Sequence, residues 1–384
     1  MNIYLDNAAT TYPKPSEVTY AVFNFMNSIG ASPGRGGYSS ALEADRIVYS
    51  CREKLSEFFG FDKPQNVIFT SNITTSINIL VKSVVKKGWH VITSSMDHNS
   101  VLRPLYGLNK ANIIDLDVIE CSKEGILNIE DFKSKIKHNT KLVILSHSSN
   151  IIGSIQPIKE IGTICKENDI YFIIDTAQTA GVLSINFNEL NCSALAFTGH
   201  KGLLGPQGIG GFIINDKMNM NSVPFIEGGT GSLSYSTVQP DYLPDKYESG
   251  TLNTPGIAGL KEGINFINNF GLTQIKEKEE FLTSRFIEGL LNIPSIAVYG
   301  PLNAQKRTAA ISINSTKISN SELGYALDTE YGIMVRTGLH CAPLAHKTIG
   351  TFPEGTIRFS FGPFNDIKDI DYALYAVMSI IRRM

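Results

Sequence analysis

Ile170-Tyr-Phe-Ile-Ile-Asp175 and Ala194-Leu-Ala-Phe-Thr198, which runs on into Gly199-His-Lys-Gly202, are the stretches that decide the fold of this chain. Each is a short, continuous apolar run followed at once by polar residues. Such runs are typical of parallel strands that are buried on both faces of a sheet. Because Asp175 and Lys201 are 26 residues apart, we expect one strand-helix-strand unit between them, with both side chains at adjacent strand ends.

Similar β-branched runs occur elsewhere, at residues 66–70, 90–94, 142–146 and 211–214, and they alternate with helical patterns at 74–86 and 157–168. This alternation predicts an α/β domain with a mostly parallel sheet. Helical segments at 256–269 and 273–291, strand-like runs at 309–314 and 356–360, and a terminal helix with Asp366 near its start predict a second, smaller α+β domain.

The composition excludes several classes of function. With 384 residues, 42% of them hydrophobic, and a net charge of −2, the chain has no global attraction for nucleic acid or anionic membrane. We therefore expect a small-molecule partner. No apolar stretch approaches the roughly 18 residues of a membrane span, and the acidic N-terminus is unlike a secretory signal.

The cysteines point to a reducing compartment. They are odd in number and widely spread, with no CxxC pair and no zinc-like Cys/His spacing: Cys51, Cys121, Cys165, Cys192 and Cys341. We expect neither a disulfide framework nor a metal site, and we expect the protein in the cytoplasm.

Three segments carry candidate chemistry. Ser71-Asn-Ile-Thr74 follows a strand and opens a helix, which suits a phosphate, although a simple helix cap explains it too. Asp175 ends a very apolar strand and needs a cation, a hydrogen-bond cluster or a capping role. Lys201 lies between glycines that let a planar ligand approach, or else that mark an ordinary turn. Together, the three match what pyridoxal phosphate (PLP) needs: a lysine for the Schiff base, an acid for the ring nitrogen and donors for the phosphate.

The C-terminal half adds a thiol and an arginine. In Val335-Arg-Thr-Gly-Leu-His-Cys-Ala342, cationic neighbours favour the thiolate of Cys341, although a buried structural cysteine is the alternative. Arg358, inside a strand-like run, needs an anionic partner, which is either a substrate carboxylate or a structural salt bridge. His98, after the run 90–94, falls at the expected sheet edge, where it can stack on a ring. The alternative is a loop histidine whose hydrogen bonds are satisfied within the protein.

These motifs resemble the cysteine desulfurase and selenocysteine lyase family, which are class V aminotransferase-like PLP enzymes of fold type I. The resemblance covers nearly the whole chain and rests on separated motifs in the family's order: Tyr4-Leu-Asp-Asn-Ala-Ala9, Met96-Asp-His98, Ser149-Asn-Ile-Ile-Gly153, Asp175-Thr-Ala-Gln178, Gly199-His-Lys201, Glu248-Ser-Gly-Thr-Leu-Asn-Thr254 and the segment around Cys341. It implies a seven-stranded-type sheet in a large domain at 16–262, with a small domain formed by 1–15 and 263–384.

The resemblance also implies residue roles. Lys201 binds PLP and acts as base, Asp175 pairs with the pyridine nitrogen, Gln178 contacts the phenolic oxygen and His98 stacks on the ring. The phosphate contacts implied are Ile73 (by its backbone), Thr74, Thr198, His200 and, from the other subunit of a homodimer, Thr251. The substrate contacts implied are Arg358, Asn150 and Asn7, with Cys341 receiving the sulfur of L-cysteine or L-selenocysteine and passing it to a sulfur-acceptor protein.

Two departures from the family pattern stand out. Asn72-Ile-Thr-Thr75 replaces a segment that usually carries an acidic residue, and Leu339 replaces a residue that is often histidine. The Arg-Thr-Gly-x-His-Cys-Ala form, 17 residues before Arg358, resembles the short-loop branch. The alternatives are a selenocysteine lyase, another class V aminotransferase or lyase, and a non-catalytic protein of the same fold. An NAD oxidoreductase is disfavoured because no strand is followed by GxGxxG.

Overall fold

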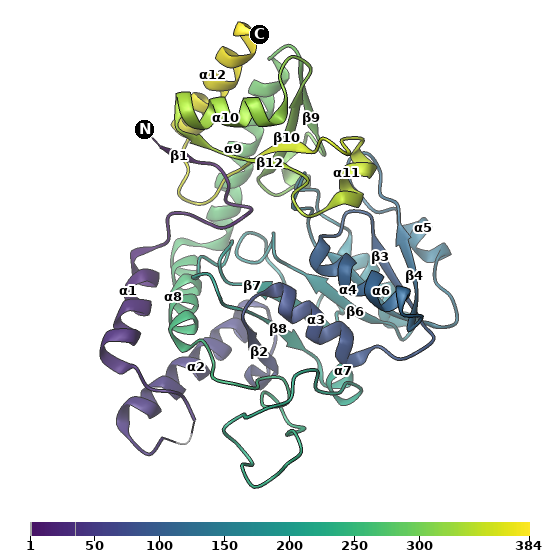
Figure 1. Ribbon diagram of the computed structural model, residues 1–384, viewed down its shortest axis with the longest axis vertical. Helices are drawn as coiled ribbons and strands as arrows, with labels where there is room; N and C mark the ends of the chain where they lie inside the picture. The colour runs from purple at the N-terminus through teal and green to yellow at the C-terminus, as the bar shows by residue number, and fades with distance from the viewer. Residues whose placement is uncertain (1, 35) are drawn as a thin grey trace.

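The computed structural model describes residues 2–34 and 36–384, which form a large and a small part, each built on its own sheet (Figure 1). The large part holds a seven-stranded sheet in the order β2-β8-β7-β6-β5-β3-β4. Neighbouring strands from β7 to β4 are parallel, whereas β8 is antiparallel to both β2 and β7. The predicted α/β fold with a mostly parallel sheet is therefore confirmed. The strands of this sheet are β2 (Val67–Thr70), β3 (Trp89–Ser94), β4 (Ile114–Ile119), β5 (Thr140–Ser146), β6 (Tyr171–Asp175), β7 (Ala194–Thr198) and β8 (Gly210–Ile214).

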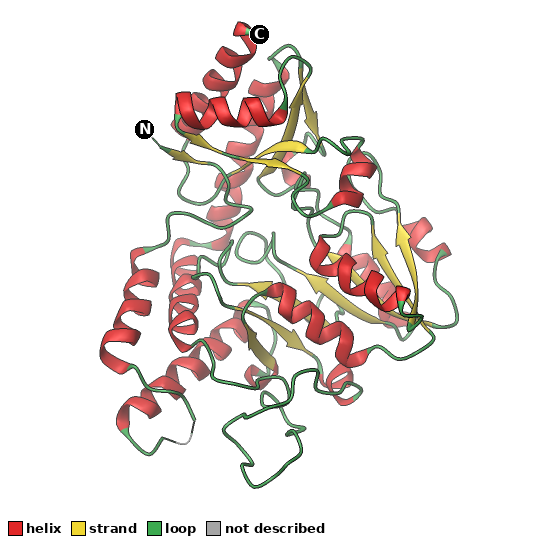
Figure 2. Cartoon of the chain, viewed as in Figure 1, coloured by secondary structure: helices red, strands yellow, loops and turns green. Residues whose placement is uncertain are grey.

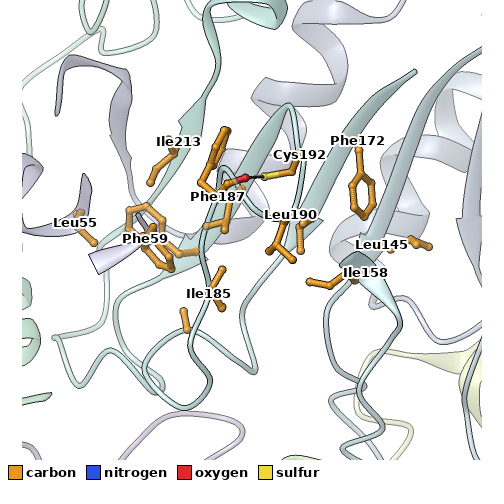
Figure 3. Packing of buried hydrophobic residues seen from close by; sticks show 14 of the residues in the cluster. Leu55, Phe59, Leu145, Ile158, Phe172, Ile185, Phe187, Leu190, Cys192 and Ile213 are labelled. Atoms are coloured by element: carbon orange, nitrogen blue, oxygen red, sulfur yellow. Dashed lines mark hydrogen bonds between the residues drawn. The ribbon is translucent and has the colours of Figure 1, made fainter. Parts of the chain in front are cut away.

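Helices lie on both faces of this sheet (Figure 2). They are α1 (Ser16–Asn24), α2 (Ser39–Phe58), α3 (Ile73–Val84), α4 (Asn99–Lys110), α5 (Ile129–Ser134), α6 (Ile158–Glu167), α7 (Asp216–Met220) and α8 (Thr254–Phe270), with short helical turns η1 (Phe25–Ile29) and η2 (Pro64–Asn66). Two buried clusters result, one on each side of the sheet. Figure 3 shows part of one of them, in which Phe59, Phe172 and Phe187 belong to the same buried cluster and Cys192 Sγ lies 3.5 Å from the carbonyl oxygen of Phe187.

The small part has a four-stranded antiparallel sheet in the order β12-β13-β10-β9, and β1 pairs in parallel with β11 beside it. Its elements are β1 (Ile3–Tyr4), α9 (Leu272–Leu291), β9 (Ile296–Tyr299), η3 (Ala304–Lys306), β10 (Ala310–Ser315), α10 (Asn320–Tyr331), β11 (Ile333–Met334), β12 (Arg336–Gly338), α11 (Pro343–Ile349), β13 (Thr356–Ser360) and α12 (Ile367–Arg383). The N-terminus thus lies against C-terminal elements (Figure 1), and Asp6 forms a parallel bridge with Ser360.

One strand of the seven-stranded sheet was not predicted from the sequence. Strand β4 alternates apolar and acidic residues, and Asp115 is exposed at this edge of the sheet. Charged residues on an edge strand discourage pairing with other chains, but they also break the continuous apolar run that identified the inner strands.

The connection between β6 and β7 corrects a second expectation. The residues after Asp175 form a series of turns, not the expected helix. Gly181 shows why, because it has a φ of +85° and a Cβ at this position would lie 2.1 Å from the carbonyl oxygen of Gly202. The connection folds tightly against the loop that carries Lys201, and a regular helix with side chains would not fit there.

Candidate active site

Lys201 lies in the loop after β7, at the carboxyl edge of the parallel strands where α/β proteins bind ligands. Burial lowers the pKa of its amine to about 8, and the nearby carboxylate of Asp175 opposes part of that effect. The glycine after it has a structural reason, since a Cβ on Gly202 would lie 2.4 Å from the carbonyl oxygen of Ala180. The flanking glycine therefore serves close packing of two loops, and the lysine itself is a desolvated amine.

Asp175 ends β6 beside β7, with Cα register to Ala196. Its Oδ1 accepts a hydrogen bond of 2.9 Å from the backbone N–H of Ala177, while Oδ2 receives none from the part of the chain that is described. Burial raises its pKa to about 6, and the charge of Lys201 lowers it in part. The capping alternative is wrong, because turns rather than a helix follow this residue. A buried carboxylate of this kind is stabilised by a nearby cation or a further hydrogen-bond donor.

The start of α3 lies beside the end of β7. A Cβ on Gly210 would lie 2.9 Å from the carbonyl oxygen of Phe197 and 3.0 Å from the Cα of Asn72. Asn72 caps α3, accepting from the N–H of Thr75 at 3.0 Å, so neither Ser71 nor Thr74 is the cap. The N–H groups of the first helical turn, from Ile73 and Thr74, remain available to an anion.

Two buried polar atoms at and just after the end of β7 have no partner among the described residues, namely Thr198 Oγ1 and His200 Nδ1. Burial lowers the pKa of His200 to about 4, and the charges of Lys201 and Lys14 add to the effect. Unpaired buried polar atoms destabilise a fold unless a ligand or water satisfies them. Thr198 Oγ1 and His200 Nδ1 are therefore candidates to bind a ligand or water.

His98 precedes α4 and caps it, because its Nδ1 accepts from the N–H of Ser100 at 3.0 Å. Burial lowers its pKa to about 4, with further contributions from Lys201, Arg103 and Arg358. The ring is therefore neutral at pH 7 and is held in place by its capping bond. Gln178, in the turn after Asp175, donates from Nε2 to the carbonyl oxygen of Ala8 at 3.1 Å.

The predicted substrate contacts form a separate group. Arg358 donates from Nη1 to the carbonyl oxygen of Asn150 at 2.7 Å, and its buried Nε has no partner among the described residues. Asn150 donates from Nδ2 to the carbonyl oxygen of His340 at 2.7 Å and leaves its Oδ1 unpaired in the same described part. Asn7 donates to Ser360 and Asn365, each at 3.1 Å, so its amide nitrogen is already committed to the protein.

The loop of Cys341 reaches the large part of the molecule. Its carbonyl oxygen accepts from the N–H of Asn99 at 2.8 Å, directly beside His98, and Ala342 packs in a cluster with Met96 and Ile151. His340 and Cys341 both have left-handed backbones, with φ of 46° and 59°, which non-glycine residues adopt only in special turns. The Cys341 side chain is exposed. The structure thus docks the backbone of this loop beside His98, although Cys341 is on the small part of the chain.

Thr251 lies near the start of α3 but does not line the cavity beside Lys201. It is exposed and lines a pocket with Ser71 and Thr75, and it is absent from the described residues that line the cavity beside Lys201. Its role toward the other subunit stays a prediction.

Three carboxylates were missed as site residues. Asp6 and Asp97 lie inside motifs that the sequence analysis quoted without assigning them. Asp97 is fully buried, with Oδ2 accepting from Thr93 Oγ1 and from the N–H and Oγ of Ser94, each at 2.8 Å, and its charge raises the pKa of Asp175. A carboxylate just after a buried strand was the available signal. Glu279, in the middle of helix α9, carried no such signal.

A cavity of about 40 Å³ joins Lys201, Gln178, Asn7 and Glu279 where the two parts of the molecule meet. Its volume is enough for a few water molecules. The carboxyl group of Glu279 makes no hydrogen bond with any residue that is described, and burial raises its pKa to about 8.

We expect Glu279→Gln to stabilise the protein at alkaline pH. The folded protein holds the Glu279 proton more tightly than the unfolded chain does, because the pKa is about 8 in the fold against an ordinary 4.5. The free energy of unfolding is therefore highest below the ordinary pKa of 4.5. It falls by up to about 5 kcal/mol as the pH rises from there through the folded pKa of about 8. Thermal unfolding at pH 9 should show a midpoint roughly 5 °C higher for the variant, with little difference at pH 5.

The matched control for this measurement is Glu280→Gln on the same helix, where the carboxylate instead pairs with Lys276 at 3.5 Å. An equal offset of Glu279→Gln at both pH values would contradict the assignment, because a packing effect does not depend on protonation.

The chain is similar over nearly its whole length to known proteins. The family model described as Aminotransferase class-V matches residues 3–373. The protein named "Probable cysteine desulfurase" from Pyrococcus abyssi is 32% identical, over 100% of this chain and 95% of that protein. The "Cysteine desulfurase" of Salmonella dublin is 29% identical, over 99% of this chain and 93% of that protein.

Solved structures give the same picture. The apo structure of a cysteine desulfurase from Thermococcus onnurineus NA1 matches with a TM-score of 0.94 and 32% identity, covering 100% of this chain and 95% of that one. The cysteine desulfurase CsdA from Escherichia coli, at 22% identity and a TM-score of 0.90, shows the fold alone.

Proposed function

This chain belongs to the aminotransferase class-V family, and we propose that it is a PLP-dependent cysteine desulfurase, which converts L-cysteine to L-alanine and leaves the sulfur as a persulfide on Cys341. Enzymes of this family use pyridoxal 5'-phosphate. The observation that carries the proposal is the arrangement at one sheet edge: a desolvated Lys201 near the Asp175 carboxylate, with the exposed thiol of Cys341 on a loop docked beside His98.

The residues present fit this cofactor. The unpartnered Thr198 Oγ1 and His200 Nδ1, together with the free N–H groups at the start of α3, suit the phosphate. The open Oδ2 of Asp175 suits the pyridine N–H, the neutral ring of His98 suits stacking, and Gln178 suits the phenolic oxygen. When bound, PLP offers a carbonyl group to the substrate amine and a ring that accepts the electron pair released at Cα.

The chain's own residues then supply the proton and sulfur chemistry. The neutral amine of Lys201 removes the Cα proton and holds it on Nζ, and the lowered pKa of about 8 favours that neutral form near pH 8. Arg358 orients the substrate carboxylate by donating from its unpaired Nε, and Asn150 does so with the second N–H of its Nδ2, whose first N–H binds the carbonyl oxygen of His340. Cys341 Sγ, as thiolate, attacks the substrate sulfur: an S–S bond forms, the C–S bond breaks with its electron pair going to carbon, and a proton on that carbon completes alanine.

The direct test uses the purified protein reconstituted with PLP and given L-cysteine with a reductant. We expect alanine and sulfide in equal amounts, because each turnover leaves one persulfide sulfur for the reductant to release. The protein stripped of PLP is the control. Absence of both products from the reconstituted protein would sink the desulfurase assignment.

A homodimer is part of the proposal. Support comes from exposed apolar side chains on neighbouring elements of the large part, namely Tyr20, Phe23, Met26, Tyr38, Leu42 and Tyr49, and from Thr251, which is exposed and outside its own Lys201 cavity. Large exposed apolar patches mark protein contacts. Sedimentation as a monomer at micromolar concentration would contradict it.

The proposal includes a cytoplasmic location and a sulfur-acceptor protein that draws sulfur from exposed Cys341. The five cysteines are unpaired, which fits a reducing compartment. Among the described residues, no helix combines the length and the apolar character needed to cross a membrane.

A further inference from the structure

Asp6 lies between two arginines of the small part. Its Oδ1 is 2.8 Å from Arg358 Nη2, and its Oδ2 is 2.9 Å from Arg336 Nη2 and 3.0 Å from Arg336 Nε. The Asp6 side chain is 11% exposed and that of Arg358 is 2% exposed, whereas Arg336 is half exposed. Asp6, two residues after the end of β1, thus joins arginines of β12 and β13 that are more than 300 positions away in the chain.

The two arginines would repel each other without this carboxylate. Arg336 in β12 and Arg358 in β13 are direct partners across the antiparallel pair, and like charges at such positions destabilise a sheet. Asp6 neutralises one of the two charges. One net positive charge is left over, and the Nε of Arg358 has no partner among the described residues.

The contacts of Arg358 also fix its orientation. Nη2 is held by Asp6 and Nη1 by the carbonyl oxygen of Asn150 at 2.7 Å, so the plane of the guanidinium cannot turn. Preorganised donors bind a carboxylate better than mobile ones, because no ordering is needed on binding.

We propose that Asp6 is a positioning residue, whose carboxylate holds the Arg358 guanidinium in the orientation that receives the substrate's α-carboxylate and ties it to Arg336 on the strand that leads to Cys341. This inference rests on the proposed function, since it assigns the anchor of the amino-acid substrate. Asp6 itself touches neither the substrate nor the reacting atoms.

The test compares a substrate that has the carboxylate with one that lacks it. For Asp6→Asn we expect KM for L-cysteine to rise at least 10-fold with kcat changed less than 3-fold, and KM for L-cysteine methyl ester to stay within 2-fold of the unmodified protein. A merely structural role would raise both KM values alike, and that result would overturn the proposal. So would unchanged kinetics with both substrates.

Two further variants keep the test decisive. Asp371→Asn breaks the Arg285–Asp371 pair at 2.9 Å on the surface of the small part, and it should leave both substrates unaffected. Asp6→Glu keeps the negative charge but displaces it by one methylene. Asp6→Glu should still raise KM for L-cysteine and not for the methyl ester, although by a smaller factor than Asp6→Asn. If Asp6→Asn does not fold, Asp6→Glu alone decides the test, and a KM for L-cysteine equal to that of the unmodified protein would overturn the proposal.

A binding readout separates this inference from the proposed function. L-Alanine and L-alaninamide differ only at the carboxylate, and their binding to the reconstituted protein is measured by the visible spectrum of the cofactor. We expect Asp6→Asn to weaken the binding of L-alanine at least 10-fold and to leave the binding of L-alaninamide almost unchanged. If the unmodified protein makes no alanine from L-cysteine, the desulfurase proposal fails while this comparison still decides the role of Asp6.

Discussion

Lys201→Ala is expected to lower alanine production from L-cysteine by at least about 10³-fold while leaving the fold intact. The variant loses both the covalent attachment point of the cofactor and the base for the Cα proton, and no second lysine lines the described part of the cavity. Removing a buried amine does not expose an unpaired partner that would unfold the protein, because Asp175 is also bonded to the N–H of Ala177.

The measurement pairs activity with a covalent readout. Borohydride reduction of the reconstituted protein, followed by peptide mass spectrometry, should place the cofactor on the peptide that contains Lys201 and on none in the variant. Lys159→Ala is the control, because this lysine lies on the surface, 72% exposed, and pairs only with Glu189 at 3.4 Å among the described residues. Reducible cofactor on another lysine of the unmodified protein would show that the attachment site is wrong.

The same residue has a pH signature. A lysine reacts with a carbonyl group only as the neutral amine, and burial lowers the pKa of Lys201 to about 8. Capture of PLP by the stripped protein should therefore speed up as pH rises from 7 to 9 and level off above that, whereas an ordinary exposed lysine would continue to speed up beyond pH 10.

Local pattern predicted the parts of the site that lie on or next to strands. Asp175 and Lys201 each follow a continuous apolar run, so their place at the sheet edge follows from the chemistry of buried parallel strands. The N-terminus of α3 was predicted for the same reason, although its cap is Asn72.

What the sequence could not supply are contacts between segments far apart in the chain. The Asp6 ion pairs join residues 330 and 352 positions apart. The hydrophobic periodicity of the segment around Asp6 gives no sign of the two arginines, and theirs gives no sign of Asp6. Glu279 lies in an otherwise regular helix, and it is buried at a cavity that it lines together with residues far away in the chain, among them Lys201. The turns between β6 and β7 likewise depend on the contact of Gly181 with Gly202.

Cys341→Ser is expected to abolish persulfide formation and to lower turnover of L-cysteine by about 10³-fold or more, with PLP binding unchanged. The other four thiols cannot take over. Burial raises the pKa of Cys121 and of Cys51 to about 12, and it raises the pKa of Cys165 and Cys192 as well, so none supplies a thiolate at neutral pH. Only Cys341 is exposed among the five.

The readout is the mass of the Cys341 peptide after a single turnover without reductant, which should increase by one sulfur atom in the unmodified protein only. Cys121→Ser is the control, because this thiol packs against the same cluster as Ala342 but is largely buried.

L-Selenocysteine separates the two activities of the family. Selenium leaves carbon more readily than sulfur does, so a selenocysteine lyase would keep its activity without the thiol. If Cys341→Ser releases alanine from L-selenocysteine at the unmodified rate and from L-cysteine hardly at all, the thiol is needed for sulfur alone; if it turns over both at the unmodified rate, the proposed attack by Cys341 is wrong.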